Sequence, residues 1–214
     1  MRIFLIFIFL IFNSCNNKQN SFKELASNIE YLNYVEKFDK ELTEHFPKKL
    51  NAKIYSIQST TIEEKNDIGL ILIINFTEFE RFEKTKNDII AQNVKAVYNN
   101  KDEDLLKINS FETKETKENL IIINNIDTNL INPLLFENKF PIPNFINYSI
   151  YNNTIFWEDE NFDIYVIDAD TGKYFEPDLL KPNIQMPSNW KNGFSRGYCI
   201  NKNKFEIIYW LSIW

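Results

Sequence analysis

The sequence predicts an α+β fold in which an N-terminal α-β-β-α-β-β layer precedes a β-rich, aromatic C-terminal part with antiparallel hairpins. Three features predict it. Apolar residues recur at helical spacing from Phe22 to Phe46, the run IGLILIINF at 68–76 has the character of a buried strand, and the chain ends in FEIIYWLSIW, where both alternating faces are apolar. With 44% hydrophobic and 25% charged residues, the composition is that of an ordinary globular protein.

The first predicted helix begins at Ser21, because Ser21 and Glu24 have the spacing of a capping box. One apolar stripe follows, and Pro47 is expected to end the helix. The polar face mixes glutamates with lysines, which favours packing on a sheet over a helix that lies on a membrane.

Two strands, 52–59 and 68–76, are expected on either side of a charged turn. A second helix is expected over 77–98. Its apolar side would be formed by Phe79, Phe82, Ile89, Ile90, Val94 and Val97.

Segments 105–113 and 119–126 have the pattern of a hairpin around a charged turn, and they complete the predicted α+β part, residues 21–128. Residues 129–146 hold three of the seven prolines and predict a linker or a packed irregular loop. The remaining residues, 147–214, form the β-rich part. The pattern leaves open whether the two parts share one sheet.

The β-rich part has five strand candidates: NYSIYNNTIFW, FDIYVIDA, KYFEP, GYCINK and FEIIYWLSIW. Residues 168–173 predict a hairpin turn with Gly172 in the left-handed region. Segments 194–200 and 205–213 should pair as a hairpin across 201–204. Because both faces of 205–213 are apolar, this strand is expected to be central or covered on both sides.

The first fourteen residues have the layout of a secretory signal: Arg2 precedes an apolar run over 3–12, and polar residues follow. Ten residues at about 1.5 Å each reach only about 15 Å, roughly half of what a membrane-spanning helix needs. A core strand over 3–12, the alternative, would have to be buried on both faces.

Residues Phe12-Asn13-Ser14-Cys15 resemble the lipobox of bacterial lipoproteins. The resemblance implies that residues 1–14 are a signal peptide, that Cys15 becomes an N-terminus carrying acyl chains such as palmitate, and that 15–20 is a lipidated, polar tether. Two or more acyl chains anchor a protein stably to a membrane. Asn16, in place of the Asp that favours inner-membrane retention in this class, indicates an extracytoplasmic protein at the periplasmic face of the outer membrane.

Several classes of function are disfavoured. A formal charge of −6 with only three arginines argues against nucleic-acid binding. Four glycines in the whole chain cannot build a glycine-rich phosphate loop, so no cofactor is expected. The pattern Asp168-x-Asp170-x-Gly172 lacks the ligands of a calcium loop, and the single histidine, His45, does not suit a zinc site, so no metal is expected.

The second cysteine, Cys199, is interpreted as a small buried apolar residue, with a reactive thiol as the alternative. If Cys15 were not acylated, a disulfide between the two cysteines would be conceivable.

The end of the chain is the most distinctive segment. Trp190, Trp210, Trp214 and Arg196 either pack in the core or form a binding surface for a sugar or a protein partner, with Arg196 as the anion contact.

No catalytic residues are assigned. The sequence favours a membrane-anchored, non-catalytic binding protein of the cell envelope, whose partner is an envelope protein or a glycan. The alternatives are a carbohydrate-binding or carbohydrate-cleaving lipoprotein that uses the tryptophans with the carboxylates of 158–163, and a purely structural envelope component.

Overall fold

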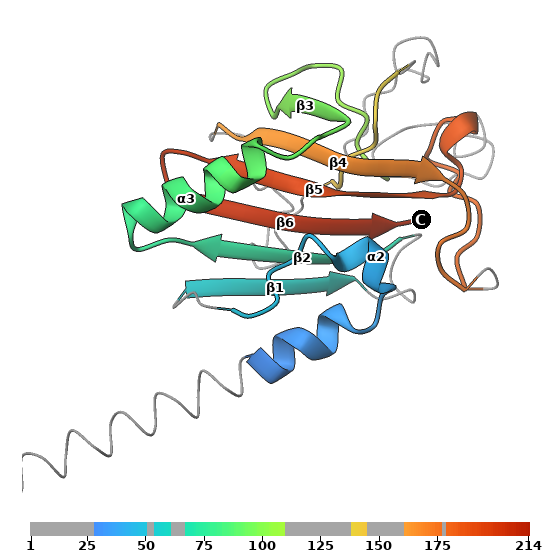
Figure 1. The fold of residues 1–214 in the computed structure, drawn as a ribbon. Coiled ribbons are helices and arrows are strands. Elements are labelled where there is room, and N and C mark those ends of the chain that lie inside the picture. Colours follow the sequence, from blue (N-terminus) through green and yellow to red (C-terminus); the bar gives the residue numbers. More distant parts are fainter. Residues whose placement is uncertain (1–27, 51–53, 61–66, 110–137, 145–160, 177–178) are drawn as a thin grey trace, which may run out of the picture. The chain divides into compact units, whose positions relative to one another are not determined.

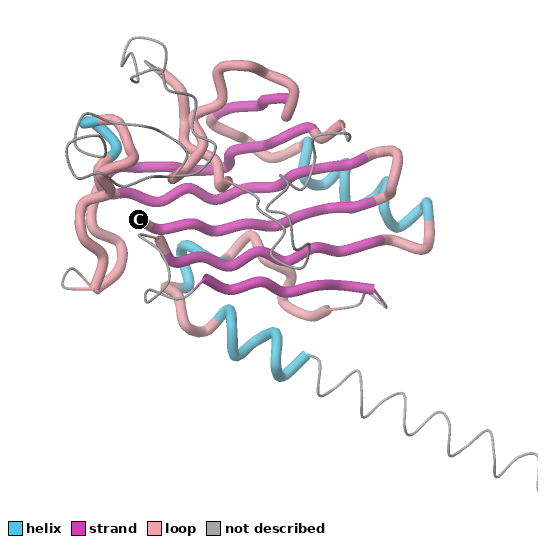
Figure 2. The backbone as a smooth tube through the Cα atoms, turned by 180° about the vertical axis from the view of Figure 1, so that it is seen from behind, coloured by secondary structure: helices cyan, strands magenta, loops and turns pink. Residues whose placement is uncertain are grey.

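The computed structural model describes residues 28–50, 54–60, 67–109, 138–144, 161–176 and 179–214 (Figures 1 and 2). The chain forms two compact units, residues 1–51 and 52–214. Of the described residues, no helix combines the length and the apolar composition that crossing a bilayer would require.

The described part of the first unit is helical but not continuous. Residues 28–35 are helical, residues 36–39 turn, and α2 spans Lys40–Thr43. The prediction of one helix up to Pro47 was therefore wrong. The chain folds back on itself because Asn28 exchanges two hydrogen bonds with the backbone of Leu50, at 2.7 and 3.2 Å, and the Tyr31 hydroxyl donates to the Pro47 carbonyl at 2.6 Å.

The second unit is built on one six-stranded antiparallel sheet in the order β1-β2-β6-β5-β4-β3 (Figure 1). This confirms the predicted α+β class. The elements, in chain order, are β1 (Ile54–Thr60), β2 (Ile68–Asn75), α3 (Phe79–Ile90), β3 (Ala96–Asn99), β4 (Asp163–Thr171), the 3₁₀ turn η2 (Ser188–Trp190), β5 (Gly193–Asn201) and β6 (Glu206–Ile213).

The sheet joins strands from both predicted parts, because β2 pairs with β6 along its whole length, from Ile68 opposite Ile213 to Asn75 opposite Glu206. The two parts therefore share one sheet. The predicted hairpin of 194–200 with 205–213 is confirmed as β5 and β6, and β6 lies in the interior of the sheet between β2 and β5.

The predictions of the second helix, of the hairpin turn over 168–173 and of the strand after Gly172 were wrong. The helix ends at Ile90, and Ala96–Asn99 instead form β3, because these residues can pair with the edge of β4. The predicted hairpin turn over 168–173 did not form, because β4 runs to Thr171 and Asp168–Thr171 pair with β5. Gly172 has the positive φ that was predicted for it, +145°, and bends the chain after the strand. Residues 173–176 are not a strand, since the Tyr174 ring folds edge-on against Phe194, 4.5 Å between centroids.

Irregular segments cover one face of the sheet. Leu106, Ile108 and Ile142 are buried there. The Ile142 N–H donates to the Leu106 carbonyl, and the Ile142 carbonyl accepts from the Ile108 N–H, both at 2.9 Å. Residues 105–109 are thus a packed loop and not the start of a hairpin strand; the rest of the predicted hairpin lies outside the described residues. Of the predicted linker, the described residues 138–144 also belong to this packed layer.

Helix α3 lies across the opposite face of the same sheet (Figure 1). Only Phe82 and Ile89 of its predicted apolar side are buried, whereas Phe79 and Ile90 are exposed. The helix therefore rests on the sheet along a narrower stripe than the sequence indicates.

Candidate functional site

The structure buries the proposed tryptophan surface. Trp190, Trp210 and Trp214 all belong to the hydrophobic core on the loop-covered face of the sheet. The Trp214 indole N–H donates to the Trp190 carbonyl at 2.7 Å, and the two rings lie 6.0 Å apart. Of the two interpretations, core packing is the one that the structure shows, and these three side chains do not form an open aromatic surface.

Glycines in β5 make room for these indoles. A Cβ on Gly197 would lie 2.1 Å from the Tyr165 carbonyl oxygen and 2.6 Å from the Trp210 ring, which is its cross-strand partner. A Cβ on Gly193 would lie 3.1 Å from the Trp214 ring. The clustering of glycine and tryptophan near the C-terminus therefore reflects packing.

Arg196 is also buried, but on the α3 side of the sheet, where it lies opposite Asp168 in the ladder. A β-bulge between Val166 and Asp168 sets this register. The Arg196 guanidinium nitrogen lies 3.9 Å from the Asp168 carboxylate. That carboxylate also receives the Lys95 ammonium at 2.7 Å. Arg196 thus faces a carboxylate of its own chain and does not offer an open anion site.

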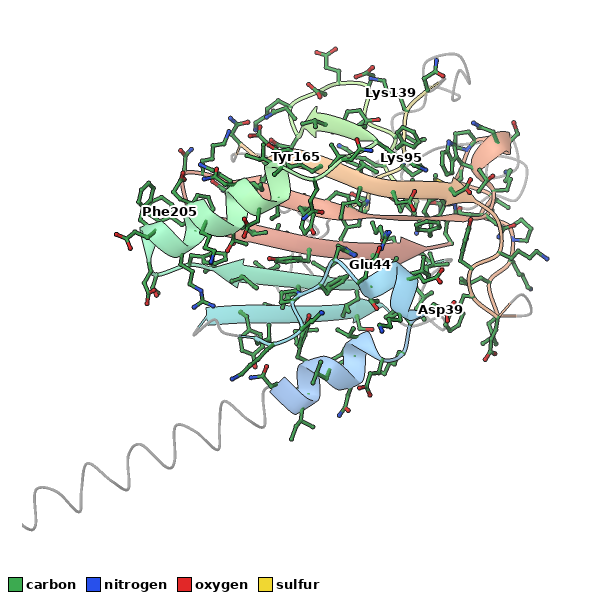
Figure 3. The ribbon with its side chains drawn as sticks, in the orientation of Figure 1. Asp39, Glu44, Lys95, Lys139, Tyr165 and Phe205 are labelled. Carbon is green, nitrogen blue, oxygen red and sulfur yellow. The ribbon has the colours of Figure 1, made fainter. Side chains whose placement is uncertain are left out.

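Lys95 also has a second hydrogen-bond partner, which accounts for its position at the edge of the sheet. Its ammonium donates to the Ala169 carbonyl at 2.9 Å, on the stretch of β4 that β3 is too short to pair (Figure 3). A lysine on a sheet edge discourages another strand from pairing there. The cluster of Lys95, Asp168 and Arg196 is accounted for by the architecture of this edge.

The carboxylates proposed for carbohydrate cleavage are not brought together in the described part. Residues 158–160 lie outside it. Asp163 accepts from Lys202 at 2.7 Å, while Asp168 pairs with Lys95. In the described part of the chain, no group of histidine, cysteine, aspartate and glutamate has the arrangement of a metal site.

Of the two cysteines, only Cys199 falls within the described residues; Cys15, the proposed lipidation site, lies outside them. Cys199 is fully buried in the core of the sheet, as predicted. Burial, with a smaller effect of the Glu206 charge, raises the pKa of its thiol well above the ordinary value. The thiol is therefore protonated and shielded in the folded protein.

Tyrosines line the sheet beneath α3. Tyr165, Tyr198 and Tyr209 lie opposite one another on β4, β5 and β6. The Tyr198 hydroxyl and the Gln92 side-chain amide are within hydrogen-bond distance at 3.2 and 3.3 Å. Burial raises the pKa values of Tyr165 and Tyr209. This row joins the C-terminal end of α3 to the centre of the sheet.

Four phenylalanines gather where β2 leads into α3 and β5 turns into β6, and two of them are exposed. We call this group the aromatic end: Phe76, Phe79, Phe82 and Phe205. Phe82 is buried, and it contacts Phe205 and Phe76 at 5.3 and 5.9 Å between ring centroids. Phe79 lies edge-on to Phe205 at 5.5 Å. Phe79 is 58% exposed and Phe205 36%. The buried Phe82 ring thus supports Phe205, and Phe205 in turn contacts Phe79.

The backbone fixes the position of Phe205, which lies beside the start of α3 (Figure 3). Its φ is +51°, a conformation that costs a residue with a side chain about 1–2 kcal/mol. Its carbonyl accepts from the Phe76 N–H at 2.9 Å. The preceding turn is held by the Asn201 side-chain oxygen, which accepts from the N–H groups of Asn203 and Lys204 at 3.0 and 3.2 Å.

Charged residues adjoin both members of the exposed ring pair in the chain. Glu78 and Glu80, both exposed, flank Phe79 at the start of α3. Lys202 and Lys204, also exposed, precede Phe205 in the turn between β5 and β6. Cations of α3 also reach this group, because the Arg81 guanidinium lies 5.9 Å from the Phe76 ring centroid and the Lys86 ammonium 5.8 Å from that of Phe82. The aromatic end therefore has charges of both signs around it.

Sequence reasoning missed this group because its members come from the β2–α3 connection, α3 and the β5–β6 turn. Phe79 was expected on the apolar side of a helix, and Phe205 on the apolar face of a strand. The one signal available was that Phe79 stands between two glutamates, at the margin of the apolar stripe.

The described unit thus belongs to the class of α+β proteins with a single antiparallel sheet, and its distinctive surface feature is an exposed aromatic pair. Comparison with protein-family models, with curated proteins and with solved structures found no match.

Proposed function

We propose that this chain is a lipid-anchored, extracytoplasmic binding protein of the cell envelope that performs no catalysis. It would be held at the membrane by acyl chains on Cys15 and would bind a protein partner through the aromatic end. The observation that carries the binding role is the exposed pair Phe79 and Phe205, whose rings contact each other and of which Phe205 packs on the buried Phe82.

Physical chemistry supports a contact role for these rings. Rigid aromatic side chains lose little conformational freedom on binding and dominate the energetic centre of protein interfaces, usually within a charged rim. A left-handed Phe205 is a backbone outlier of the kind that clusters at functional sites. The aromatic end combines both features on one rigid support.

The alternatives have less support. The glycan interpretation depended on tryptophans near the C-terminus, and Trp190, Trp210 and Trp214 are buried. A purely structural envelope role would require no exposed, strained ring.

The anchor is tested by mass spectrometry and fractionation of the protein from its own envelope. We expect the mature chain to begin at an acylated Cys15 and to sediment with membranes, and a Cys15→Ala variant to be soluble or unprocessed. Full-length chain with Met1 attached and no fatty acid on Cys15 would overturn the anchor.

The binding role is tested by capture from the same envelope with two matched variants. Phe79→Ser removes an exposed ring of the aromatic end, while Ile90→Ser removes an apolar side chain of similar exposure, 47%, at the other end of α3. We expect Phe79→Ser to lose most of a captured protein and Ile90→Ser to retain it. Equal capture by both variants would place the binding surface elsewhere.

A further inference from the structure

We propose that β1 pairs along its outer edge with β1 of a second copy of this chain, so that two sheets join into one across a twofold axis. The inference goes beyond the proposed function, because it uses no residue of the aromatic end. It does not depend on the lipid anchor either.

The two edges of the sheet, β1 and β3, differ in how they are protected (Figure 1). The β3 edge is four residues long, and beyond it Lys95 occupies the Ala169 carbonyl of β4. The β1 edge is seven residues long, and none of the seven is charged, glycine or proline. A long edge strand without these features presents a row of N–H and C=O groups with which another strand can pair.

The backbone of β1 has one partner strand among the described residues, which is β2. In that part of the chain, no loop or helix backbone bonds to residues 54–60. The chemistry of an edge selects its occupant, because a row of alternating donors and acceptors is matched by another extended strand.

The apolar interior of the sheet also reaches this edge. Leu72 and Ile74 of β2 are buried, whereas Ile57 and Tyr55, which lie opposite them on β1, are only partly buried. A further strand beside β1 would cover these two side chains. The edge therefore offers both main-chain hydrogen-bonding groups and apolar area, the two contributions on which binding by strand addition depends.

The sequence of β1 makes a second copy of β1 a suitable partner. Ile57 is the central residue of Ile54–Thr60, so an antiparallel pair centred on Ile57 uses the whole strand. Tyr55 of one copy then lies opposite Ser59 of the other, and each residue keeps its own face of the joined sheet. Because β1 has no charged residue, this register brings no like charges together.

The protected β3 edge limits the assembly to two copies. Pairing of β1 with β1 uses the outer edge of both copies and leaves the two β3 edges at the ends of the joined sheet. A contact between identical surfaces about a twofold axis closes on itself and does not continue into a filament. Since one pair of strands buries less area than a standard interface, we expect a weak complex.

Single cysteines on β1 test the register in the full chain, purified in mild detergent and concentrated. In the proposed pair, the two Ile57 Cα atoms would lie about 4.5–5.5 Å apart, a separation that a disulfide bridges. We expect Ile57→Cys to form a disulfide-linked dimer under mild oxidation several-fold faster than the unaltered chain, whose own cysteines give the background.

Tyr55→Cys and Ser59→Cys are the matched controls. Either variant alone would place its two new cysteines about 13 Å apart along the strands, beyond the reach of a disulfide, whereas a mixture places one of each opposite the other. We expect linkage in the mixture and only background in each variant alone. Val97→Cys, 55% exposed on the protected β3 edge, should also give only background.

Charge exchange at the exposed Ser56 tests the pairing without a change in the core. The two copies of Ser56 would be diagonal neighbours, about 7–8 Å apart. In chains that also carry Ile57→Cys, we expect Ser56→Lys or Ser56→Glu alone to slow linkage several-fold. A mixture of the two should restore most of the rate at low salt, because opposite charges then face each other.

Three results would overturn the proposal: only background linkage of Ile57→Cys, equal linkage by each β1 cysteine alone, or no recovery in the Ser56 mixture. Capture of another envelope protein that Ser56→Lys abolishes, without linkage between copies, would assign the edge to a foreign strand and also reject self-pairing. Addition of Phe79→Ser to Ile57→Cys should leave linkage unchanged, which separates this proposal from the binding role of the aromatic end.

Discussion

At the scale of single residues, Phe205 shows how a surface position can carry a local cost. A left-handed backbone favours glycine or asparagine, yet this position holds a phenylalanine that is only partly covered. Its ring packs on Phe82, which offsets part of the strain. The balance between these two effects can be measured.

We expect Phe205→Asn to change the free energy of unfolding by less than about 1 kcal/mol, because relief of about 1–2 kcal/mol of backbone strain offsets the lost ring contacts. Denaturant unfolding measures the change. Phe82→Ala, at a buried position, is the matched comparison and should cost about 3–5 kcal/mol. A similar loss for both variants would mean that Phe205 serves the core and not the surface.

A second prediction for a single residue concerns the pH dependence of stability that results from the buried thiol of Cys199. Because burial raises the pKa of the thiol in the folded state, the folded protein keeps the proton after the unfolded chain has released it. The contribution of this thiol to stability is therefore complete below the unfolded pKa of about 8.5 and is lost as the pH rises above it, by up to about 1.4 kcal/mol per pH unit.

Unfolding at pH 7 and pH 10 checks this, with Cys199→Ala as the control that should lose less stability between the two pH values. In parallel, a thiol-specific alkylating reagent should modify Cys199 only after unfolding. Rapid alkylation of the folded protein would contradict the buried position.

At the scale of elements, the sheet depends on small residues at chosen register positions. Gly197 of β5 lies opposite Trp210 of β6, and the indole occupies the space that a side chain would take. At the edge of the sheet, β3 is short, and Lys95 covers the backbone of β4 beyond it. The positions of the central strands thus depend on side-chain packing. At this edge, Lys95 occupies a backbone carbonyl of β4 that another strand could otherwise pair with.

We expect Gly197→Ala to destabilise the fold by at least about 1–3 kcal/mol, since its Cβ would meet the Tyr165 carbonyl and the Trp210 ring. Thermal or denaturant unfolding gives the value. Ser56→Ala, at an exposed position of β1, should stay within about 0.5 kcal/mol. A neutral Gly197→Ala would show that Trp210 can shift without loss.

At the scale of the whole molecule, residues far apart in the chain form one cooperative sheet. β2 contributes from the first half, and β5 and β6 form the C-terminal hairpin against it. These three central strands, β2, β5 and β6, are the most buried elements of the described chain. Loops cover one face of the sheet, and α3 lies on the other (Figures 1 and 2).

We expect the amide hydrogens of β2, β5 and β6 to exchange slowest and to share one opening free energy, equal to that of global unfolding. Hydrogen exchange followed by mass spectrometry over a denaturant series measures this. The amides of β3, on a short edge, should exchange through smaller openings. Independent exchange of β2 and β6 would contradict a single cooperative sheet.

The sequence by itself determined the α+β class, the strands of the sheet centre and the two faces of β6, because these follow from local periodicity and from turn residues such as those at 201–204. It also predicted a buried Cys199. These properties depend on neighbours within a few residues, which a sequence displays directly.

Only the tertiary structure decided which aromatic residues are core and which are surface. Trp190 and Phe79 are both large and apolar, and the local sequence pattern does not distinguish a buried from an exposed side chain at these positions. Trp190 is buried because loops pack around it, and Phe79 is exposed because of its position on α3. Likewise, residues 96–98 were predicted to end the second helix, whereas 96–99 form β3 because the edge of β4 offers backbone partners. Burial and strand pairing are set by contacts between distant segments, and those contacts exist only in the folded chain.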